Sequence, residues 1–219
     1  HSVVDTFPGI PIDNPMSLNV VDICPVGALI DKNFMYQARV WFARRVESVC
    51  AGCSRGCNVT GTMLDNDIKR LQPRRNDAVN GFWMCDEGRL NTRYVASNRR
   101  LIAAKGTVRE LAGAAKAVVD RHGAGSVAIL ASTYQTLEEL HLIKKLAGIL
   151  QAPVAFLTST RGERWTSKSG FVIEPDKTPN RKGAEKLFGK VELPPAVLTE
   201  KIKGLICING IPDLVYPPE

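Results

Sequence analysis

Cys50-Ala-Gly-Cys53-Ser-Arg-Gly-Cys57, with Cys85 a further 28 residues along the chain, is the stretch that decides how the first half of the sequence folds. Three thiolates on one tight loop can hold three corners of a cubane, and a distant fourth cysteine closes the last corner. The two glycines inside the motif let the backbone bend closely around such a cluster and point amides at its sulfurs. The spacing therefore predicts one [4Fe–4S] cluster held by these four cysteines.

A structural zinc site with four cysteine ligands is the alternative interpretation of the same residues. Zinc sites usually pair their ligands as two short C-x₂₋₄-C segments, whereas here one segment supplies three cysteines and the other supplies one. This asymmetry favours iron and sulfide over zinc. Disulfides are a third possibility, but the spacing and the lack of an export signal favour metal thiolates in a reducing compartment.

Two further cysteines lie outside this motif. Cys24 follows a short apolar helix expected over residues 18–24, which Ser17 could cap, and it precedes a proline. A Cys-Pro pair in this setting is the usual last ligand of a bacterial ferredoxin-type cluster, although the C-x₂-C-x₂-C run that would supply its partners does not occur in this chain. A buried free thiol is the alternative. Cys207 lies in an apolar stretch, and we expect it in the core.

Short strands joined by turns are expected before residue 105. β-forming residues occur at 40–42, and a hairpin is predicted from 58–64 and 68–71 around Asp65-Asn66-Asp67. Residues 88–97 are expected to form a short helix.

Helices and strands alternate after residue 105. Capping boxes begin two helices, at Thr107 and at Thr136, and each is followed by apolar residues at helical spacing. Residues 160–178 are polar and are expected to be irregular. Further helices are expected over 180–187 and 196–202, and apolar strands over 126–131, 154–157 and 204–208.

This alternation implies a parallel sheet covered by helices. The expected fold class is therefore α+β, with a small β-rich cluster domain followed by an α/β domain. The expected domains are the tail of a ferredoxin-like cluster segment over 1–35, a [4Fe–4S] domain over 36–104 and an α/β scaffold over 105–219.

The chain is basic, with a net charge of +7. Paired arginines at 44–45, 74–75 and 99–100 could contact nucleic acid, but aromatic residues that would stack on bases make up only 6% of the chain. We therefore expect no nucleic-acid partner and assign these cations to solvent, to a partner subunit or to balancing a cluster's negative charge. No apolar run is long enough to span a bilayer. Neither His122 nor His141 has an acid–nucleophile arrangement, so no catalytic residue is expected.

The residues from 13 to 101 resemble the family of the G subunits of NADH dehydrogenase (complex I type) and, more distantly, the molybdopterin oxidoreductases. The resemblance is carried by Asp13-Asn-Pro-Met-Ser-Leu-Asn-Val-Val-Asp-Ile-Cys24-Pro-Val-Gly-Ala-Leu29, by the four clustered cysteines and by Cys85-Asp-Glu-Gly-Arg89. Residues 131–140 and 176–184 are similar, more loosely, to parts of the molybdopterin-type domain.

The family begins with a [2Fe–2S] part that is absent here. The resemblance implies that Cys24 completes a second [4Fe–4S] cluster whose other ligands precede His1. It also implies that no molybdopterin is bound, because Glu87 stands where molybdenum enzymes of this type usually carry a lysine. Within 157–162, Ser159 is the sole candidate for a molybdenum ligand. The C-terminal half then resembles a vestigial scaffold.

The function that the resemblance implies is electron transfer. The chain would be an iron–sulfur subunit of a multi-subunit NADH-linked oxidoreductase, either complex I-like or an NAD-linked hydrogenase or formate dehydrogenase, without an active site of its own. Its partners would be other subunits, including one that binds flavin and NADH, in the cytoplasm or at the inner face of a membrane. The alternatives are a fragment of a molybdenum or tungsten bis-pterin oxidoreductase and a zinc-stabilised interaction module.

Overall fold

The computed structural model describes residues 6–92, 95, 106–191 and 194–208. The chain divides into two compact units. The first comprises His1–Ala96 with Trp165–Ile173, and the second comprises Ser97–Arg164 with Glu174–Glu219. A nine-residue segment thus interrupts the second unit in sequence but belongs to the first.

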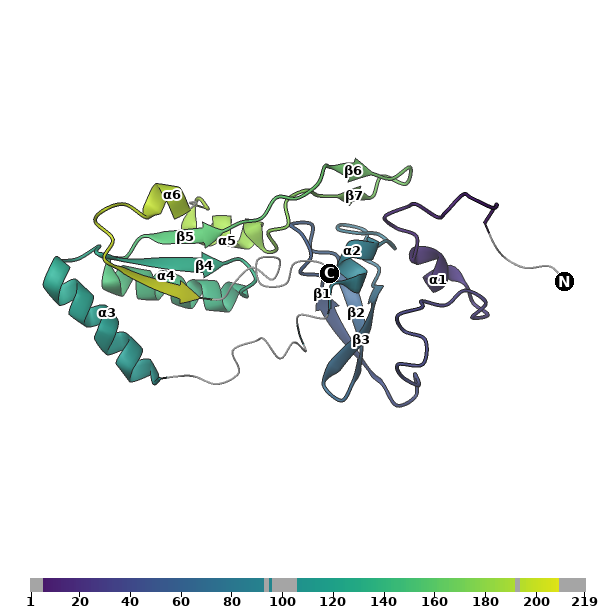
Figure 1. Ribbon diagram of the computed structural model, residues 1–219, viewed down its shortest axis with the longest axis horizontal. Helices are drawn as coiled ribbons and strands as arrows, with labels where there is room; N and C mark the ends of the chain where they lie inside the picture. Colours follow the sequence, from purple (N-terminus) through teal and green to yellow (C-terminus); the bar gives the residue numbers. More distant parts are fainter. Residues whose placement is uncertain (1–5, 93–94, 96–105, 192–193, 209–219) are drawn as a thin grey trace. The chain divides into compact units, whose positions relative to one another are not determined.

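A three-stranded antiparallel sheet in the order β1-β2-β3 forms the base of the first unit (Figure 1). Its strands are β1 (Arg44–Val49), β2 (Asn58–Leu64) and β3 (Asp67–Pro73). A tight turn at Asp65 and Asn66 joins β2 to β3, with φ angles of 53° and 61°. Positive φ at both central residues is the geometry that matches the twist of a hairpin. The predicted hairpin is therefore confirmed.

Two short helices and a two-stranded ribbon complete the first unit. The helices are α1 (Asn19–Ile23) and α2 (Asp86–Leu90), and the ribbon pairs β6 (Trp165–Thr166) with β7 (Val172–Ile173). The expectation that residues 160–178 are irregular was wrong at this ribbon, whose two-residue strands are too short to leave a periodic pattern. Helix α2 starts earlier than the helix predicted over 88–97. Residues 93–94 and 96–97 of that prediction lie outside the described residues.

The first strand of the sheet was placed wrongly by sequence. Val40, Trp41 and Phe42 lie in turns and are 54–71% exposed, although they are strong β-formers. The strand begins at Arg44 instead, because residues 44–49 pair in continuous register with β2. Pairing partners, rather than intrinsic preference, decide which residues become a strand.

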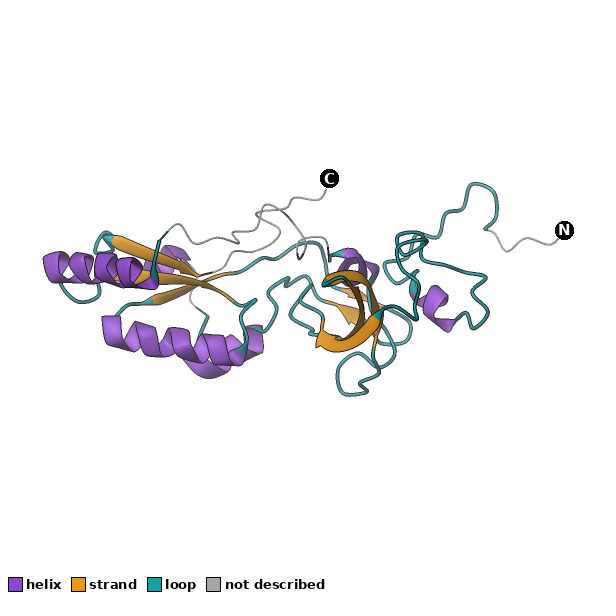
Figure 2. Ribbon diagram, turned by 90° about the horizontal axis from the view of Figure 1, so that it is seen from below, coloured by secondary structure: helices purple, strands orange, loops and turns teal. Residues whose placement is uncertain are grey.

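A parallel sheet in the order β5-β4-β8 forms the second unit (Figure 2). Its strands are β4 (Val127–Ser132), β5 (Val154–Leu157) and β8 (Gly204–Ile208), and its helices are α3 (Val108–His122), α4 (Leu137–Leu150), α5 (Arg181–Phe188) and α6 (Pro194–Val197). One face, with Ile129 and Phe156, packs against α4 and α5, and Val197 of α6 packs on Ala128 and Ala155 of the other. The expected fold class is confirmed.

Two helices of the second unit begin where the sequence predicts, whereas another helix is shorter than predicted. Both capping boxes form, at Thr107 with Glu110 and at Thr136 with Glu139. The helix predicted over 196–202 is replaced by the four-residue α6, which begins at a pair of prolines.

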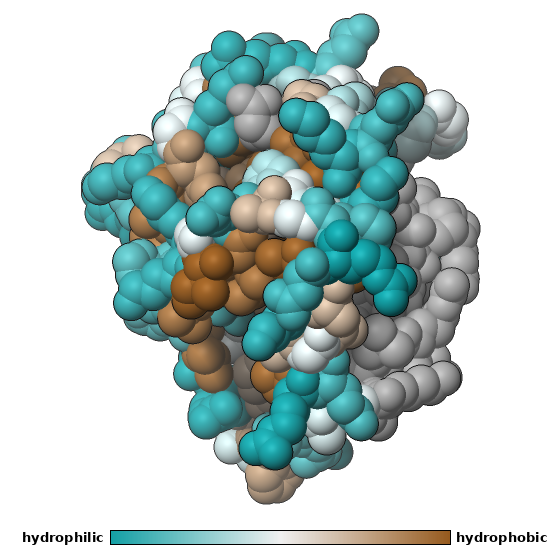
Figure 3. All heavy atoms as spheres, turned by 90° about the vertical axis from the view of Figure 1, so that its left-hand side faces the viewer, coloured by the Kyte–Doolittle hydropathy of each residue, from teal (hydrophilic) through white to brown (hydrophobic). Residues whose placement is uncertain are grey.

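The prediction that Cys207 belongs to the core was wrong. Cys207 is exposed, although it lies in β8. Strand β8 is at the edge of the described sheet, and alternate residues along it are exposed, so Leu205 and Cys207 face away from the core that Ile206 joins. Figure 3 shows that apolar side chains also gather on part of the second unit's surface. Separately, Leu142 and Ile149 of α4 are exposed.

Candidate metal centre

The structure brings the four cysteines of the motif into one buried group. Cys50 directly follows β1, Cys53 and Cys57 lie in the loop before β2, and Cys85 is the N-cap residue of α2. Their exposed fractions are 8%, 8%, 4% and 7%. The backbone N–H of Cys50 donates to the carbonyl of Cys57 at 2.8 Å and closes the loop. All are free thiols.

Backbone amides and glycines line this group closely. The N–H of Gly52 lies 3.4 Å from Cys50 Sγ, and the N–H of Gly88 lies 3.3 Å from Cys85 Sγ. A Cβ added at Gly88 would lie 2.9 Å from Cys50 Sγ and 3.4 Å from Cys85 Sγ. The side chains of Cys50 and Cys85 therefore meet over a helical glycine, and the Cε of Met84 would lie 3.6 Å from the same added Cβ.

In the protein without a metal, the surroundings of this group favour the neutral thiol over the thiolate. Burial, with a further contribution from the neighbouring thiols, raises the pKa of Cys50 and of Cys57 to about 12. A metal binds the thiolate form, which is costly in an apolar environment unless positive charge offsets it. Four buried sulfurs with amides aimed at two of them therefore fit a metal–sulfur group.

The cysteines share one buried region without converging on a single point. Among the described residues, no three His, Cys, Asp or Glu side chains are placed to hold one metal ion. The four thiolates of a [4Fe–4S] cluster each bind a different iron, so they stand farther apart than the ligands of a mononuclear ion. Three of the cysteines instead belong to one hydrophobic cluster with Met84, Phe171 and Ile173.

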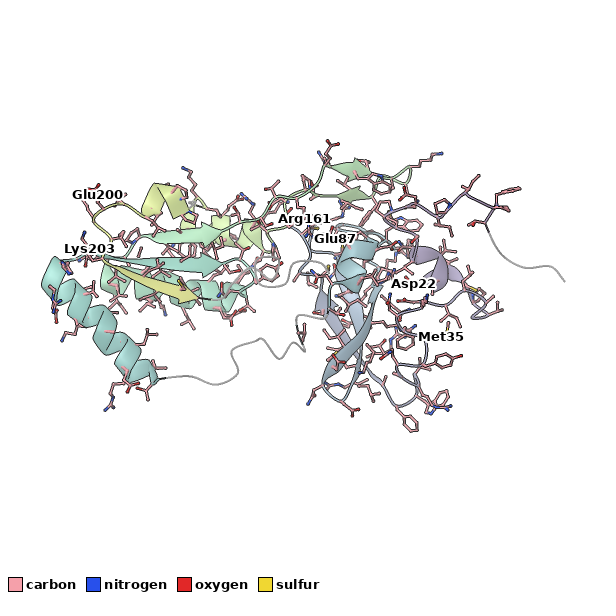
Figure 4. The ribbon with its side chains drawn as sticks, viewed as in Figure 1. Asp22, Met35, Glu87, Arg161, Glu200 and Lys203 are labelled. Atoms are coloured by element: carbon pink, nitrogen blue, oxygen red, sulfur yellow. The ribbon has the colours of Figure 1, made fainter. Side chains whose placement is uncertain are left out.

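Helix α1 is tied to α2, the helix that Cys85 caps. The carboxylate of Asp86 accepts hydrogen bonds from the Ser17 hydroxyl at 2.6 Å and from the Leu18 N–H at 3.1 Å. The expectation that Ser17 caps this helix was therefore wrong, because its hydroxyl donates to a distant carboxylate. Arg89, 5% exposed, donates to Asp22 Oδ2 at 2.6 Å. Asp22 on α1 and Glu87 on α2 are labelled in Figure 4.

Cys24 stands apart from the buried group. It is half-buried and follows the last residue of α1. Backbone hydrogen bonds, chiefly from Leu29 and Val26, lower the pKa of its thiol. A cavity of about 290 Å³ lies beside it and is lined by polar residues that include Asp22, Arg70 and Gln72, and by apolar ones such as Phe34. Cys24 is thus less buried than the alternative of a buried free thiol requires. The backbone amides around its sulfur favour the thiolate form.

Sequence reasoning missed three contributors to the site. Asp86 and Arg89 lie within the motif that carried the resemblance, but their partners on α1 are more than 60 residues away. Phe171, in the ribbon, packs beside the cysteines, and no sequence pattern indicated this contact.

Ser159, the candidate molybdenum ligand, follows β5 in the second unit, where its N–H donates to Thr178 Oγ1.

Comparison with known proteins agrees with the geometry. Residues 43–97 match the family model described as the molybdopterin oxidoreductase Fe4S4 domain, and this part of the chain contains all four clustered cysteines. The segment that holds the four clustered cysteines is thus similar to iron–sulfur domains of the molybdopterin oxidoreductase type.

Over most of its length the chain is homologous to subunits of NADH-quinone oxidoreductase. It is 32% identical to NADH-quinone oxidoreductase subunit 3 of Thermus thermophilus over 164 residues, which cover 70% of this chain and 20% of that protein. It is 27% identical to the G subunit of the Rickettsia felis NADH-quinone oxidoreductase over 158 residues, or 67% of this chain and 23% of that protein.

Another relative is named for an oxidoreductase other than NADH-quinone oxidoreductase. The chain is 31% identical to the NADPH-Fe(3+) oxidoreductase subunit alpha of Geobacter sulfurreducens over 157 residues, which cover 66% of this chain and 18% of that protein. The chain therefore spans about a fifth of the length of these relatives. In the described part of the chain, no helix has the length and apolar character needed to cross a membrane.

Proposed function

We propose that this chain holds one [4Fe–4S] cluster through Cys50, Cys53, Cys57 and Cys85 and relays electrons within a multi-subunit NADH-linked oxidoreductase. The observation that carries the proposal is that all four cysteines are buried together in the segment that matches an Fe4S4 domain. The bound cluster would supply reversible one-electron chemistry. The homology to NADH-quinone oxidoreductase subunits supports the setting.

The protein's own contribution would be to shield the cluster from water and to orient its ligands. The loop over 50–57 and the N-terminus of α2 would supply ligands from two segments, so binding would tie the sheet to α2. The amides of Gly52 and Gly88 would donate toward the sulfurs and stabilise negative charge there. Apolar neighbours such as Met84, which is fully buried, would keep water away.

The finer parts of the proposal concern Cys24, molybdopterin and partners. We propose that Cys24 is the last ligand of a second [4Fe–4S] cluster, whose remaining ligands lie outside this sequence, and the amides around its sulfur support that role. We also propose that no molybdopterin is bound, because Glu87 replaces the usual lysine. The partners would be other subunits of the complex, including a flavin- and NADH-binding one, in the cytoplasm or at the inner face of a membrane.

The test is the content of iron, acid-labile sulfide, zinc and molybdenum in anaerobically purified protein. We expect about four irons and four sulfides per chain, with no molybdenum. Cys53→Ser should lose most of the iron, whereas Cys207→Ser, which changes an exposed cysteine of the second unit, should retain it. Stoichiometric zinc without sulfide would instead identify an interaction module, and bound pterin would identify a molybdenum or tungsten enzyme fragment.

A further inference from the structure

A half-buried arginine lies inside the cysteine loop. Arg55, between Cys53 and Cys57, donates from Nη2 to the carbonyl of Val79 at 2.6 Å. Its guanidinium carbon lies 4.6 Å from the ring centroid of Phe171. Its Nε is buried and has no hydrogen-bond partner among the described residues. The cation is thus fixed next to the cluster site rather than extended into solvent.

The ring under this cation is itself firmly placed. Phe171 is 4% exposed and packs in the same hydrophobic cluster as Cys57 and Cys85. The ribbon holds it through Ser167, whose hydroxyl accepts the Phe171 N–H at 2.9 Å and whose N–H donates to the Phe171 carbonyl at 2.8 Å. The ribbon lies in the nine-residue segment Trp165–Ile173, which belongs to the first unit although the residues on both sides of it belong to the second. A segment far from the cysteines in sequence therefore contributes directly to the cluster site.

The charge of Arg55 acts on the sulfur positions. Arg55 lies two residues before Cys57 in the same loop, and the ring under its guanidinium packs in the same hydrophobic cluster as Cys57, so its positive charge favours negative charge at this sulfur. In a site of low dielectric, such a charge acts more strongly than at the surface. Reduction of a cluster adds one electron and therefore one negative charge, and a fixed nearby cation stabilises that reduced state.

We propose that Arg55, held on the ring of Phe171, raises the reduction potential of the cluster, and that the β6–β7 ribbon is the device that positions this charge. The inference rests on the proposed function, because it requires a cluster at the four cysteines. One electron from a one-electron donor enters the cluster, while the guanidinium stays protonated and forms and breaks no bond. Phe171 is a positioning residue that acts through Arg55.

The test is a reductive titration followed by EPR on Arg55→Gln, Arg55→Lys and Phe171→Leu, with iron and sulfide measured on each variant. We expect Arg55→Gln to favour the oxidised state roughly tenfold, a negative shift of about 59 mV for one electron. Arg55→Lys should keep most of the wild-type potential, and Phe171→Leu should shift it in the same direction as Arg55→Gln but less.

The chain offers a matched control. Arg75 also lies over a phenylalanine ring, 4.6 Å from the centroid of Phe82, but its side chain is 61% exposed and paired with Asp77. Arg75→Gln and Phe82→Leu should leave the potential unchanged.

Three outcomes would overturn the inference. The first is a cluster-loaded Arg55→Gln with the wild-type potential, and the second is an equal shift in Arg55→Gln and Arg55→Lys, which would mean a packing effect. The third is a cluster-loaded Phe171→Leu with the wild-type potential, which would refute the role of the ribbon. If Arg55→Gln does not bind a cluster, the reduction potentials of Arg55→Lys and Phe171→Leu decide whether the inference holds. Wild-type protein without iron and sulfide would refute the proposed function itself.

Discussion

Gly88→Ala offers a sharp test of how tightly the cysteines are packed. The new Cβ would lie 2.9 Å from Cys50 Sγ, well inside the 3.5–4.0 Å of ordinary contacts, and 3.4 Å from Cys85 Sγ. Overpacking of this kind costs about 1–3 kcal/mol, whereas replacing glycine by alanine inside a helix gains about 0.5–1 kcal/mol. The two ranges leave a net loss of between about 0 and 2.5 kcal/mol, and we expect a value near the middle, about 1–1.5 kcal/mol. The added methyl group would displace the side chains of two of the proposed ligands.

The assay combines denaturant unfolding with release of iron to a chelator. Because each 1.4 kcal/mol is a tenfold change in an equilibrium constant, Gly88→Ala should bind its iron roughly tenfold less tightly than the wild type. Gly113→Ala, in α3, is the control, since an added Cβ there meets nothing within 4 Å. It should gain about 0.5–1 kcal/mol and leave iron binding unchanged. A Gly88→Ala protein that retains iron like the wild type and gains stability like the control would refute the reasoning.

Three further substitutions test the surroundings of the site. Asp86→Ala removes the acceptor at the start of α1 and should cost about 1 kcal/mol in the free energy of unfolding, measured with urea; an unchanged midpoint would contradict this role. Arg89→Met leaves the carboxylate of Asp22 without its cation and should cost about 3 kcal/mol, a loss that Asp22→Asn in the same protein should partly restore. Glu87→Gln removes a negative charge that contributes to the raised pKa of Cys50, so the cluster potential should rise in a redox titration, and a fall would contradict the assignment.

Local signals in the sequence predicted much of the fold. The Asp65-Asn66 turn and the capping boxes at Thr107 and Thr136 each depend on residues within a few positions, and the structure confirms all three. The cysteine motif predicted that these three cysteines belong together with Cys85, and the structure buries all four. Chemistry that is complete within a short segment can be read from that segment alone.

The features that sequence reasoning missed depend on distant partners. Strand β1 carries charged residues and exists because it pairs with β2. The hydroxyl of Ser17 turns to Asp86, 69 residues away, instead of capping its own helix. Phe171 reaches the cysteines from a ribbon whose strands are two residues long. Cys207 is exposed on a strand at the edge of the sheet formed by the described residues, and no local pattern encodes that position.

Low-temperature EPR of anaerobic protein after reduction by dithionite tests the central claim most directly. The account predicts a reduced-cubane signal that integrates to about one spin for every four irons, and that disappears in Cys53→Ser but persists in Cys207→Ser. A protein that contains stoichiometric zinc and gives no signal after reduction would contradict it.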